Sequence, residues 1–450
     1  MVSISKMIQK LKNRAKVLRN DPHMREVALG ALLAFALKIV GAGLMFGFNV
    51  AIARLLGAEG TGLYFLAFSI VAICSVISRL GLDNSLLRFI ATHAAKEEWG
   101  KVNGVYALGM RMALIASGLI SLILFILAPW VAEYLFNKPE LTEPLRWMSL
   151  SILPFTLLNL QSESLKGLKC IRDAMLVQGV GLPLVALALI FPLVEWSGIL
   201  GVVWAYTLGA IVISILGAWR WQKNISQHPA ALTKFPFKEL WESCKPLLMV
   251  ALMNRALMPW APILLLGIWV TAEEVGVFGA ATRIVLLVSF MLVAINNIVA
   301  PKFAELYAKE NMKALGEVAR RSAFLITLLA SPIFLVLFFY GEWVMSLFGS
   351  EFTDGATILA ILAVGQLINV LCGSVGYLLM MSGNEKVYRN ITISSALLQL
   401  FIIVTLASSM GGVGVAIASS LALVFMNIAA VYFVYSKLGI VTIPGLRAVI

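Results

Sequence analysis

The chain has 450 residues, of which 60% are hydrophobic and 13% are charged, and its formal net charge is +12. Soluble domains carry about a quarter charged residues, so this balance excludes an ordinary soluble protein and is typical of an integral membrane protein. The net positive charge does not indicate nucleic-acid binding, because the basic residues gather between long apolar runs.

A basic segment precedes the first apolar run. Residues 1–26 contain seven lysines and arginines and lead into an apolar stretch that is too long for a secretory signal peptide. We therefore expect 1–26 to be cytoplasmic and to precede a retained first membrane helix. The segment forms either a solvated tail that orients this helix or an amphipathic helix on an anionic leaflet.

Apolar runs bounded by glycine, proline and charge predict an all-α polytopic membrane protein with twelve transmembrane helices. Their predicted limits are 27–53, 62–80, 104–128, 146–165, 173–194, 199–219, 246–269, 276–299, 322–340, 355–380, 391–410 and 413–436. With these limits, and with Arg79 at the end of the second span counted in the connection that follows, 28 of the 35 lysines and arginines fall on the side that also holds both termini. Positive charge is enriched in cytoplasmic connections, so both termini are expected to be cytoplasmic.

Short stretches that recur at nearly one spacing indicate an internal duplication. Two pairs of similar stretches are each separated by 214 residues. The first pair is AEGTGLY at 58–64 and AEEVGVF at 272–278, and the second is RFIATHAAKEEW at 88–99 and KFAELYAKENMK at 302–313. Two copies of six helices predict two lobes related by a pseudo-two-fold axis along the membrane normal, around a central cationic cavity. The predicted segments are the basic N-terminal segment 1–26, the N-lobe 27–219, the basic cytoplasmic linker 220–245, the C-lobe 246–436 and the cytoplasmic C-terminal segment 437–450.

The sequence lacks the residue patterns of an enzyme or a metal protein. The four cysteines stand singly, no phosphate-binding GxxxxGK[ST] loop occurs, and the three histidines fall in connections between the predicted helices. We therefore expect no enzymatic activity, no metal site, no disulfide framework and no bound cofactor.

Apart from Arg79 and Arg146 at helix ends, four cations lie inside the predicted spans, where a charged side chain costs on the order of 2.5–3.5 kcal/mol. They are Lys38, Arg111, Arg255 and Arg283. Too few acidic residues lie in the spans to pair with all four, so some are expected to face a water-filled cavity. As alternatives, Arg111 and Arg283 can extend to the nearer membrane surface, and Lys38 and Arg255 can form a structural pair with Glu163 or with backbone carbonyls.

Lys38 and Arg255 fall near the membrane midplane on the equivalent first helices of the two lobes. Pro259 and Pro262 follow Arg255, and each removes a backbone hydrogen-bond donor from the helix. Freed carbonyl groups are tolerated at membrane depth where the helix lines a cavity or is packed in protein, so this helix is expected to bend beside a cavity.

A cationic cavity selects an anionic ligand, and arginine binds phosphate bidentately. A small anion would fit, but a phosphate on a lipid fits better because its tail can stay in the bilayer. Asn254, Gln366 and Asn369 are candidate contacts for sugar hydroxyls, although hydrogen bonding between helices is the commoner role of such residues.

Residues 55–114 resemble the polysaccharide flippases, the Wzx-type branch of the multidrug/oligosaccharidyl-lipid/polysaccharide exporter superfamily. The residues that carry this resemblance are Gly57, Gly62 and Tyr64, which open the second helix, and the stretch GLDNSLLRF with Gly81, Arg88 and Phe89. The twelve-helix layout in two lobes extends the likeness over nearly the whole chain.

The resemblance implies a flippase that moves undecaprenyl-pyrophosphate-linked oligosaccharide from the inner to the outer leaflet of a bacterial plasma (inner) membrane. Such export serves surface polysaccharides such as O-antigen or exopolysaccharide, by alternating access coupled to an H+ or Na+ gradient. Arg255 and Lys38 would hold the pyrophosphate, Arg111 and Arg283 would be secondary, and Glu163 is the acidic candidate for ion coupling. The implied partners are the lipid-linked oligosaccharide, membrane lipids and a polysaccharide polymerase or export complex, and not nucleic acid.

Three alternatives stay open. Lipid II flippases of the same superfamily typically have fourteen helices, whereas twelve are predicted here. Multidrug or cation antiporters should carry carboxylates for cationic drugs, and the charge here has the opposite sign. A membrane glycosyltransferase or polymerase would need catalytic acids and large outer loops, which the predicted layout does not offer.

Overall fold

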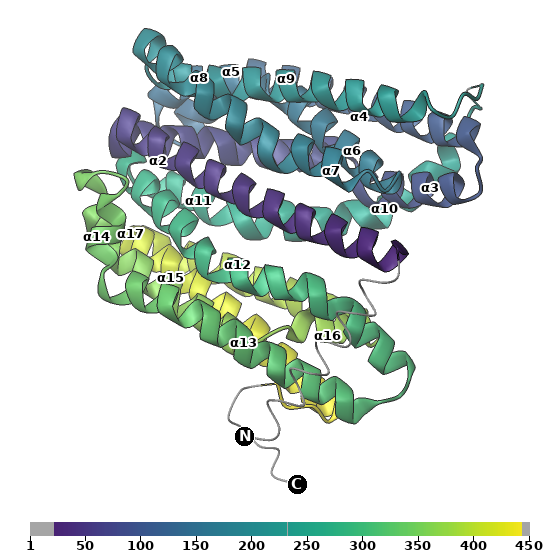
Figure 1. The fold of residues 1–450 in the computed structure, drawn as a ribbon. Helices are drawn as coiled ribbons and strands as arrows, with labels where there is room; N and C mark the ends of the chain where they lie inside the picture. Colours follow the sequence, from purple (N-terminus) through teal and green to yellow (C-terminus); the bar gives the residue numbers. More distant parts are fainter. Residues whose placement is uncertain (1–21, 232, 443–450) are drawn as a thin grey trace.

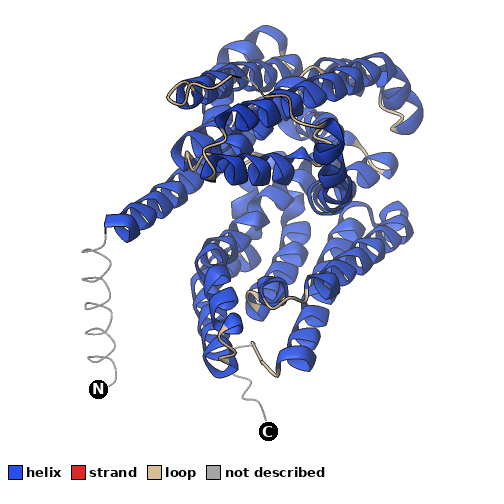
Figure 2. Ribbon diagram, turned by 90° about the vertical axis from the view of Figure 1, so that its right-hand side faces the viewer, coloured by secondary structure: helices blue, strands red, loops and turns tan. Residues whose placement is uncertain are grey.

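The computed structural model describes residues 22–231 and 233–442, and within these ranges the chain forms helices joined by short connections (Figure 2). Nine helices of this described part are long and apolar enough to cross a membrane. Their outward faces expose large apolar side chains, such as Leu119, Leu122 and Ile126. The predicted all-α membrane fold is confirmed, whereas these nine helices do not by themselves establish the number of spans as twelve.

The chain divides into two bundles in Figure 1, with residues 22–225 above, residues 272–438 below and residues 237–269 between them. The elements of the first half are α2 (Pro22–Ser78), α3 (Leu82–Ala95), α4 (Trp99–Trp130), η1 (Val131–Leu135), η2 (Pro139–Leu141), α5 (Thr142–Ser149), α6 (Ile152–Gly167), α7 (Ile171–Met175), η3 (Leu176–Gly181), α8 (Leu182–Ser197) and α9 (Ile199–Ile225). The elements of the second half are α10 (Phe237–Ala251), η4 (Leu252–Leu257), α11 (Met258–Trp269), α12 (Ala272–Ala308), α13 (Met312–Phe339), α14 (Gly341–Ser346), η5 (Ser350–Gly355), α15 (Ala356–Cys372), α16 (Val375–Met381) and α17 (Glu385–Leu438).

The two longest helices, α2 and α17, each contain two of the predicted spans. The backbone turns at Gly57 in α2 and at Gly411 in α17. Their φ angles of 67° and 53° are positive, a backbone conformation that residues other than glycine rarely adopt. The first amide after each turn donates to a glutamate from another element, to Glu351 at 2.8 Å and to Glu274 at 2.6 Å. These carboxylates satisfy amides that a restarting helix leaves unpaired.

Helices α2 and α12 pack against each other across the two halves, with a glycine of each helix at the contact. A Cβ atom on Gly62 would overlap the carbonyl oxygen of Ala272 and would lie 2.9 Å from the amide nitrogen of Gly276. A Cβ on Gly276 would overlap the carbonyl oxygen of Ala58. Gly62 and Gly276 are the glycines that the repeat makes equivalent, so the backbones of the two halves touch where neither helix carries a side chain.

The predicted linker 220–245 is mostly helical, because α9 runs on to Ile225 and α10 begins at Phe237. The connection between them lies along α4, where the Thr233 amide donates to the carbonyl oxygen of Gly100 at 3.0 Å. The five segment boundaries stay predictions, but the part of the linker without helix is short and docked on the first half.

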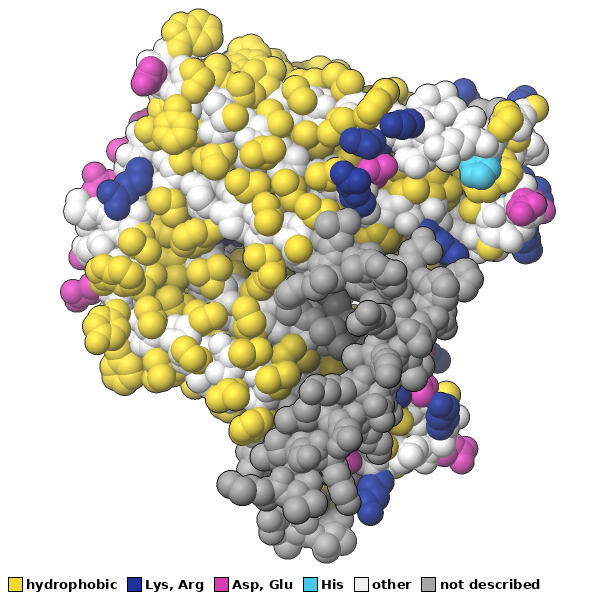
Figure 3. Space-filling view, viewed as in Figure 1, with side chains coloured by type: hydrophobic (Ala, Val, Ile, Leu, Met, Phe, Trp, Pro, Cys, Tyr) yellow, Lys and Arg dark blue, Asp and Glu magenta, His cyan; other side chains and the backbone are white. Residues whose placement is uncertain are grey.

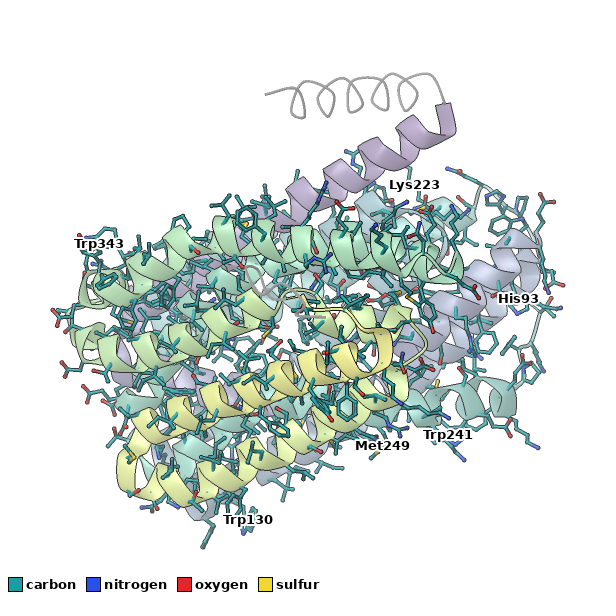
Figure 4. The ribbon with its side chains drawn as sticks, turned by 90° about the horizontal axis from the view of Figure 1, so that it is seen from below. His93, Trp130, Lys223, Trp241, Met249 and Trp343 are labelled. Atoms are coloured by element: carbon teal, nitrogen blue, oxygen red, sulfur yellow. The ribbon has the colours of Figure 1, made fainter. Side chains whose placement is uncertain are left out.

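The two ends of the molecule differ in charge. Figure 3 shows a broad apolar band between them, and Figure 4 places Trp343 at one end and His93 at the other. The end with α14 and η5, here called the acidic end, carries Glu140, Glu143, Glu342, Glu351 and Asp354. The end with α3 and the start of α10, here called the basic end, carries Arg88, Lys96, Lys101, Lys223 and Lys245.

Gly62→Ala is expected to destabilise the protein by about 1–3 kcal/mol, because the added methyl group forces the α2 and α12 backbones apart. Gly43→Ala on the same helix is the matched control, since a Cβ there meets nothing within 4 Å. Thermal unfolding of the purified protein in detergent measures both variants. Equal melting temperatures for the two would contradict a close backbone contact at Gly62.

Candidate functional site

Arg255 lies on η4, a π-helical segment between α10 and α11. Pro259 has no amide hydrogen for the carbonyl oxygen of Arg255, and Pro262 has none for that of Met258, so regular α-helical bonding fails over this turn. The hydrogen bonds widen to the i→i+5 pattern, which single turns within helices often adopt at functional sites. The expected interruption is therefore present as a change of helix type.

The partner of Arg255 in the structure is Asp83, at the start of α3 in the other half. Oδ1 of Asp83 lies 3.1 Å from Nη1 of Arg255 and 2.8 Å from Nη1 of Arg79. The side chains of Asp83 and Arg79 are 4% and 7% exposed, whereas that of Arg255 is 43% exposed. Two guanidinium groups share one carboxylate, so this cluster keeps a net positive charge, and Arg255 is its accessible member.

The stretch GLDNSLLRF brings Asp83 to this position. Gly81 has a left-handed backbone (φ 77°), and a Cβ there would lie 2.5 Å from the carbonyl oxygen of Cys244. The hydroxyl groups of Ser85 and Ser243 are 2.8 Å apart, and Nη2 of Arg88 donates to the Ser243 hydroxyl at 2.9 Å. The family motif thus docks α3 on α10, in what we call the α3–α10 contact.

The far end of α3 is also anchored. The ring of Phe89, the last motif residue, packs against Phe235 with centroids 5.3 Å apart. His93 Nδ1 lies 2.6 Å from Oε2 of Glu98, and Lys101 donates to Oε1 of the same carboxylate at 3.0 Å. Hydrogen bonds from His93 and Lys101 hold the pKa of the Glu98 carboxyl below its ordinary value. Helix α3 is therefore fixed at both ends, so Asp83 is held in place.

Lys38 and Glu163 occupy a different region. Lys38 is exposed on α2, within electrostatic range of Lys166. Lys166 donates to Oε1 of Glu163 at 2.8 Å and to Oε1 of Gln178 at 2.9 Å. Glu163 therefore pairs with Lys166, three residues further along α6. The alternative in which Glu163 pairs with Lys38 or Arg255 is not what the structure shows.

Arg283 and Arg111 have surroundings of their own. The guanidinium group of Arg283 lies over the rings of Phe65 and Trp260, 5.3 and 4.8 Å from their centroids, so it does not extend to the membrane surface. Arg111 is exposed on α4. The structure gives the four predicted cations separate neighbours and does not gather them into one cavity.

A cavity of about 200 Å³ within the second half is lined by Arg283 and Gln366. The amide oxygen of Gln366 accepts hydrogen bonds from Ser289 at 2.5 Å and from Asn369 at 3.0 Å. Asn254 is exposed on η4 beside Arg255. Of the three candidate sugar contacts, Gln366 lines this cavity, Asn369 lines a neighbouring one while bonded to Gln366, and Asn254 lies at the π-helical segment.

Sequence reasoning missed Arg79 and Asp83. The predicted limits end the second span at residue 80, which assigned the buried Asp83 to a connection. Their spacing of four residues, with Gly81 between them, is the signal that could have marked a buried ion pair.

The fold is that of the multidrug/oligosaccharidyl-lipid/polysaccharide (MOP) superfamily. The inward-facing conformation of a multidrug resistance MATE family transporter of this superfamily is similar with a TM-score of 0.75 and 18% identity, covering 91% of this chain and 98% of that one. The lipid II flippase MurJ in an inward closed conformation has a TM-score of 0.70 and 16% identity, covering 90% of this chain and 87% of that one. A MOP superfamily transporter from Pyrococcus furiosus, described as having a binding pocket of reverse polarity, has a TM-score of 0.67 and 18% identity over 94% and 97%.

Sequence comparison defines the family. Residues 27–307 match the model of the polysaccharide biosynthesis protein family, and residues 248–405 match the MatE model. The chain is 25% identical over 443 residues to the "Probable low-salt glycan biosynthesis flippase Agl15" of Haloferax volcanii, covering 94% of this chain and 88% of that protein. A stretch of 138 residues is 25% identical to stage V sporulation protein B of Bacillus subtilis, covering 31% of this chain and 26% of that protein.

The protein belongs to the polysaccharide biosynthesis protein family, whose model spans more than half of the chain. It is a multi-pass membrane protein with the role of a transporter or flippase in polysaccharide synthesis. The predicted resemblance is confirmed, and the relatives are flippases and transporters rather than enzymes.

Asp83→Asn is expected to cost about 3–5 kcal/mol of stability, because it leaves the buried Arg79 without its carboxylate. Arg255→Gln should cost less than about 1 kcal/mol, since the Arg255 side chain is 43% exposed and solvent screens its pair with Asp83. Thermal unfolding of the two variants in the same detergent tests this order. A larger loss in Arg255→Gln would mean that Arg255, and not Arg79, is the main partner of Asp83.

Proposed function

We propose that the protein moves undecaprenyl-pyrophosphate-linked oligosaccharide from the inner to the outer leaflet of a bacterial plasma membrane. The observation that carries this proposal is the Arg79–Asp83–Arg255 cluster, in which two arginines face one buried carboxylate. An anionic group on the substrate would balance the remaining positive charge. The similarity to a glycan biosynthesis flippase supports the choice of a glycan as the cargo.

The exposed guanidinium group of Arg255 is suited to a lipid-linked phosphate. Guanidinium stays charged when partly buried and binds phosphate through two parallel hydrogen bonds. Met249, on α10 six residues before Arg255, is an exposed apolar side chain, so an apolar tail has a surface to follow outside the cluster. In this proposal Lys38, which lies apart from the cluster in the structure, stays a candidate phosphate contact on the first half, and Arg111 stays a secondary candidate.

The proposed orientation of the protein in the membrane follows from the distribution of its basic residues. The basic end would be cytoplasmic together with both termini, because 28 of the 35 lysines and arginines fall on that side. The headgroup would enter from the basic end and leave at the acidic end. Export of a cationic drug is disfavoured, since the accessible charge at η4 is positive.

Alternating access supplies the mechanism in this proposal, with an H+ or Na+ gradient as the driving force. In the structure the halves are joined at the basic end by the α3–α10 contact and at the acidic end by α2, α12 and Glu351. Opening either end requires the contacts of that end to break. Glu163 remains the acidic candidate for coupling, and its pair with Lys166 is the bond that a coupling ion would have to weaken.

Arg255→Ala is expected to lower polysaccharide export at least tenfold while the protein still reaches the membrane, because the phosphate loses a bidentate partner. Arg255→Lys should recover only part of the activity, since ammonium cannot form two parallel bonds. The measurement is surface polysaccharide in a deletion strain complemented with each variant. Lys309→Ala, at an exposed surface pair, is the control, and normal export by Arg255→Ala would remove Arg255 from the mechanism.

A disulfide between Ser85→Cys and Ser243→Cys is expected to stop export, because the hydroxyl groups at these positions are 2.8 Å apart across the α3–α10 contact. The native cysteines, Cys244 among them, are first replaced by serine. Oxidation should abolish export and a reducing agent should restore it. Full export by the oxidised, cross-linked protein would show that the α3–α10 contact stays closed throughout transport.

A further inference from the structure

Arg283 is a charged side chain in the interior with no counter-ion among the described residues. Its neighbours are two aromatic rings, Phe65 from the first half and Trp260 from the second, and its Nε atom is buried without a hydrogen-bond partner. Arg283 therefore differs from Arg255, whose guanidinium group meets a carboxylate.

The rings alone leave the charge of Arg283 under-compensated. A cation over an aromatic ring recovers only part of the free energy that it costs to move a charged group out of water. The guanidinium group of Arg283 has five N–H donors, of which the buried Nε donor has no partner, and aromatic rings accept such donors weakly. An anion that enters beside Arg283 would supply both the missing charge and the missing acceptors.

The cavity beside Arg283, which we call the Arg283 cavity, has the lining that such an anion needs. No acidic residue lines it among the described residues, and its polar side chains are Thr282, Arg283, Gln366, Gln399, Ser419 and Ser420. The hydroxyl groups of Thr282 and Ser420 already donate to backbone carbonyl oxygens, so the donors for an anion come from Arg283, Gln366, Gln399 and Ser419. The Gln399 amide donates to the Ser419 hydroxyl at 3.2 Å, which leaves the hydroxyl hydrogen of Ser419 free to donate onward. A volume of about 200 Å³ holds a compact anion with water, because one water molecule needs only about 10–15 Å³ of such space.

The cavity also lies next to the π-helical segment. Met258 and Pro259, which line it, follow Arg255 by three and four residues, or about 5–6 Å along a helix. A sugar attached to a phosphate at Arg255 is therefore close enough to present a substituent to the Arg283 cavity.

We propose that the Arg283 cavity is a second anion site, separate from the Arg79–Asp83–Arg255 cluster, which binds a small anionic group. The group is a carboxylate on a sugar of the glycan, as in a uronic acid, or a free inorganic anion. The first source rests on the proposed flippase function, and the second does not. In either case Arg283 holds the charge while Gln399 and Ser419 donate to the remaining oxygens.

The test is ligand binding to the purified full-length protein in detergent. Sodium glucuronate, glucose, sodium chloride and sodium phosphate are the probes, and calorimetric titration and the melting temperature are the readouts. Glucuronate is expected to bind and raise the melting temperature, and glucose, which lacks the carboxylate, is not. Arg283→Gln should weaken this binding at least tenfold, whereas Arg321→Gln, an exposed arginine of the same half, should leave it unchanged.

Two further variants separate the outcomes. Arg255→Gln should keep the response, so a failure of the proposed phosphate site leaves this test intact. Ser419→Leu fills the cavity with Arg283 in place and should also remove the response, which covers the case in which Arg283→Gln does not fold. Arg283-dependent binding of chloride or phosphate without binding of glucuronate would assign the site to a free anion. The absence of any anion response that depends on Arg283 or on the open cavity would overturn the proposal.

Discussion

A single buried carboxylate organises the contact between the two halves. Asp83 lies at the start of α3, and its Oδ1 atom meets Arg79 of its own half and Arg255 of the other. A buried carboxylate needs compensation by positive charge and hydrogen bonds, which here comes from two directions. Arg79 is buried and holds Asp83 permanently, whereas Arg255 is half-exposed and can leave Asp83 at little cost. The same carboxylate therefore fixes the local structure and allows an exchangeable partner.

The structure keeps its deep cations by two different means. Arg255 keeps contact with water and with a carboxylate, since the π-helical turn leaves its side chain partly open. Arg283 is placed against Phe65 and Trp260, and its Nε atom lies away from water. The first arrangement favours exchange with a ligand that arrives from solvent or lipid. The second favours a ligand that is already confined within the protein.

Much of this organisation could be predicted from the residues, and the failures have a common cause. Arg255 stands out because a charge interrupts an apolar run, and Pro259 marks the weak turn because it lacks an amide hydrogen. Asp83 could not be recognised as its partner, because that pairing depends on how α3 packs against α10. The aromatic rings around Arg283 were hidden for the same reason, since Phe65, Trp260 and Arg283 come from three helices. Patterns along the chain predict helices and unusual charges, whereas the partners of those charges are set by contacts between distant segments.

The π-helical turn at η4 also bears on how such a site can change. An i→i+5 turn holds about one residue more than an α-helical turn, so it behaves as a one-residue insertion within a continuous helix. Helices α10 and α11 keep their faces toward their own neighbours, and the extra residue displaces only the turn that carries Arg255. Loss of one residue from 252–257 would remove the wide turn and withdraw the arginine while the surrounding packing survives, with Pro259 still leaving one carbonyl group without an amide partner. In evolutionary terms the turn that carries Arg255 and the helices around it are separable, so sequences can acquire or lose this turn in one small step.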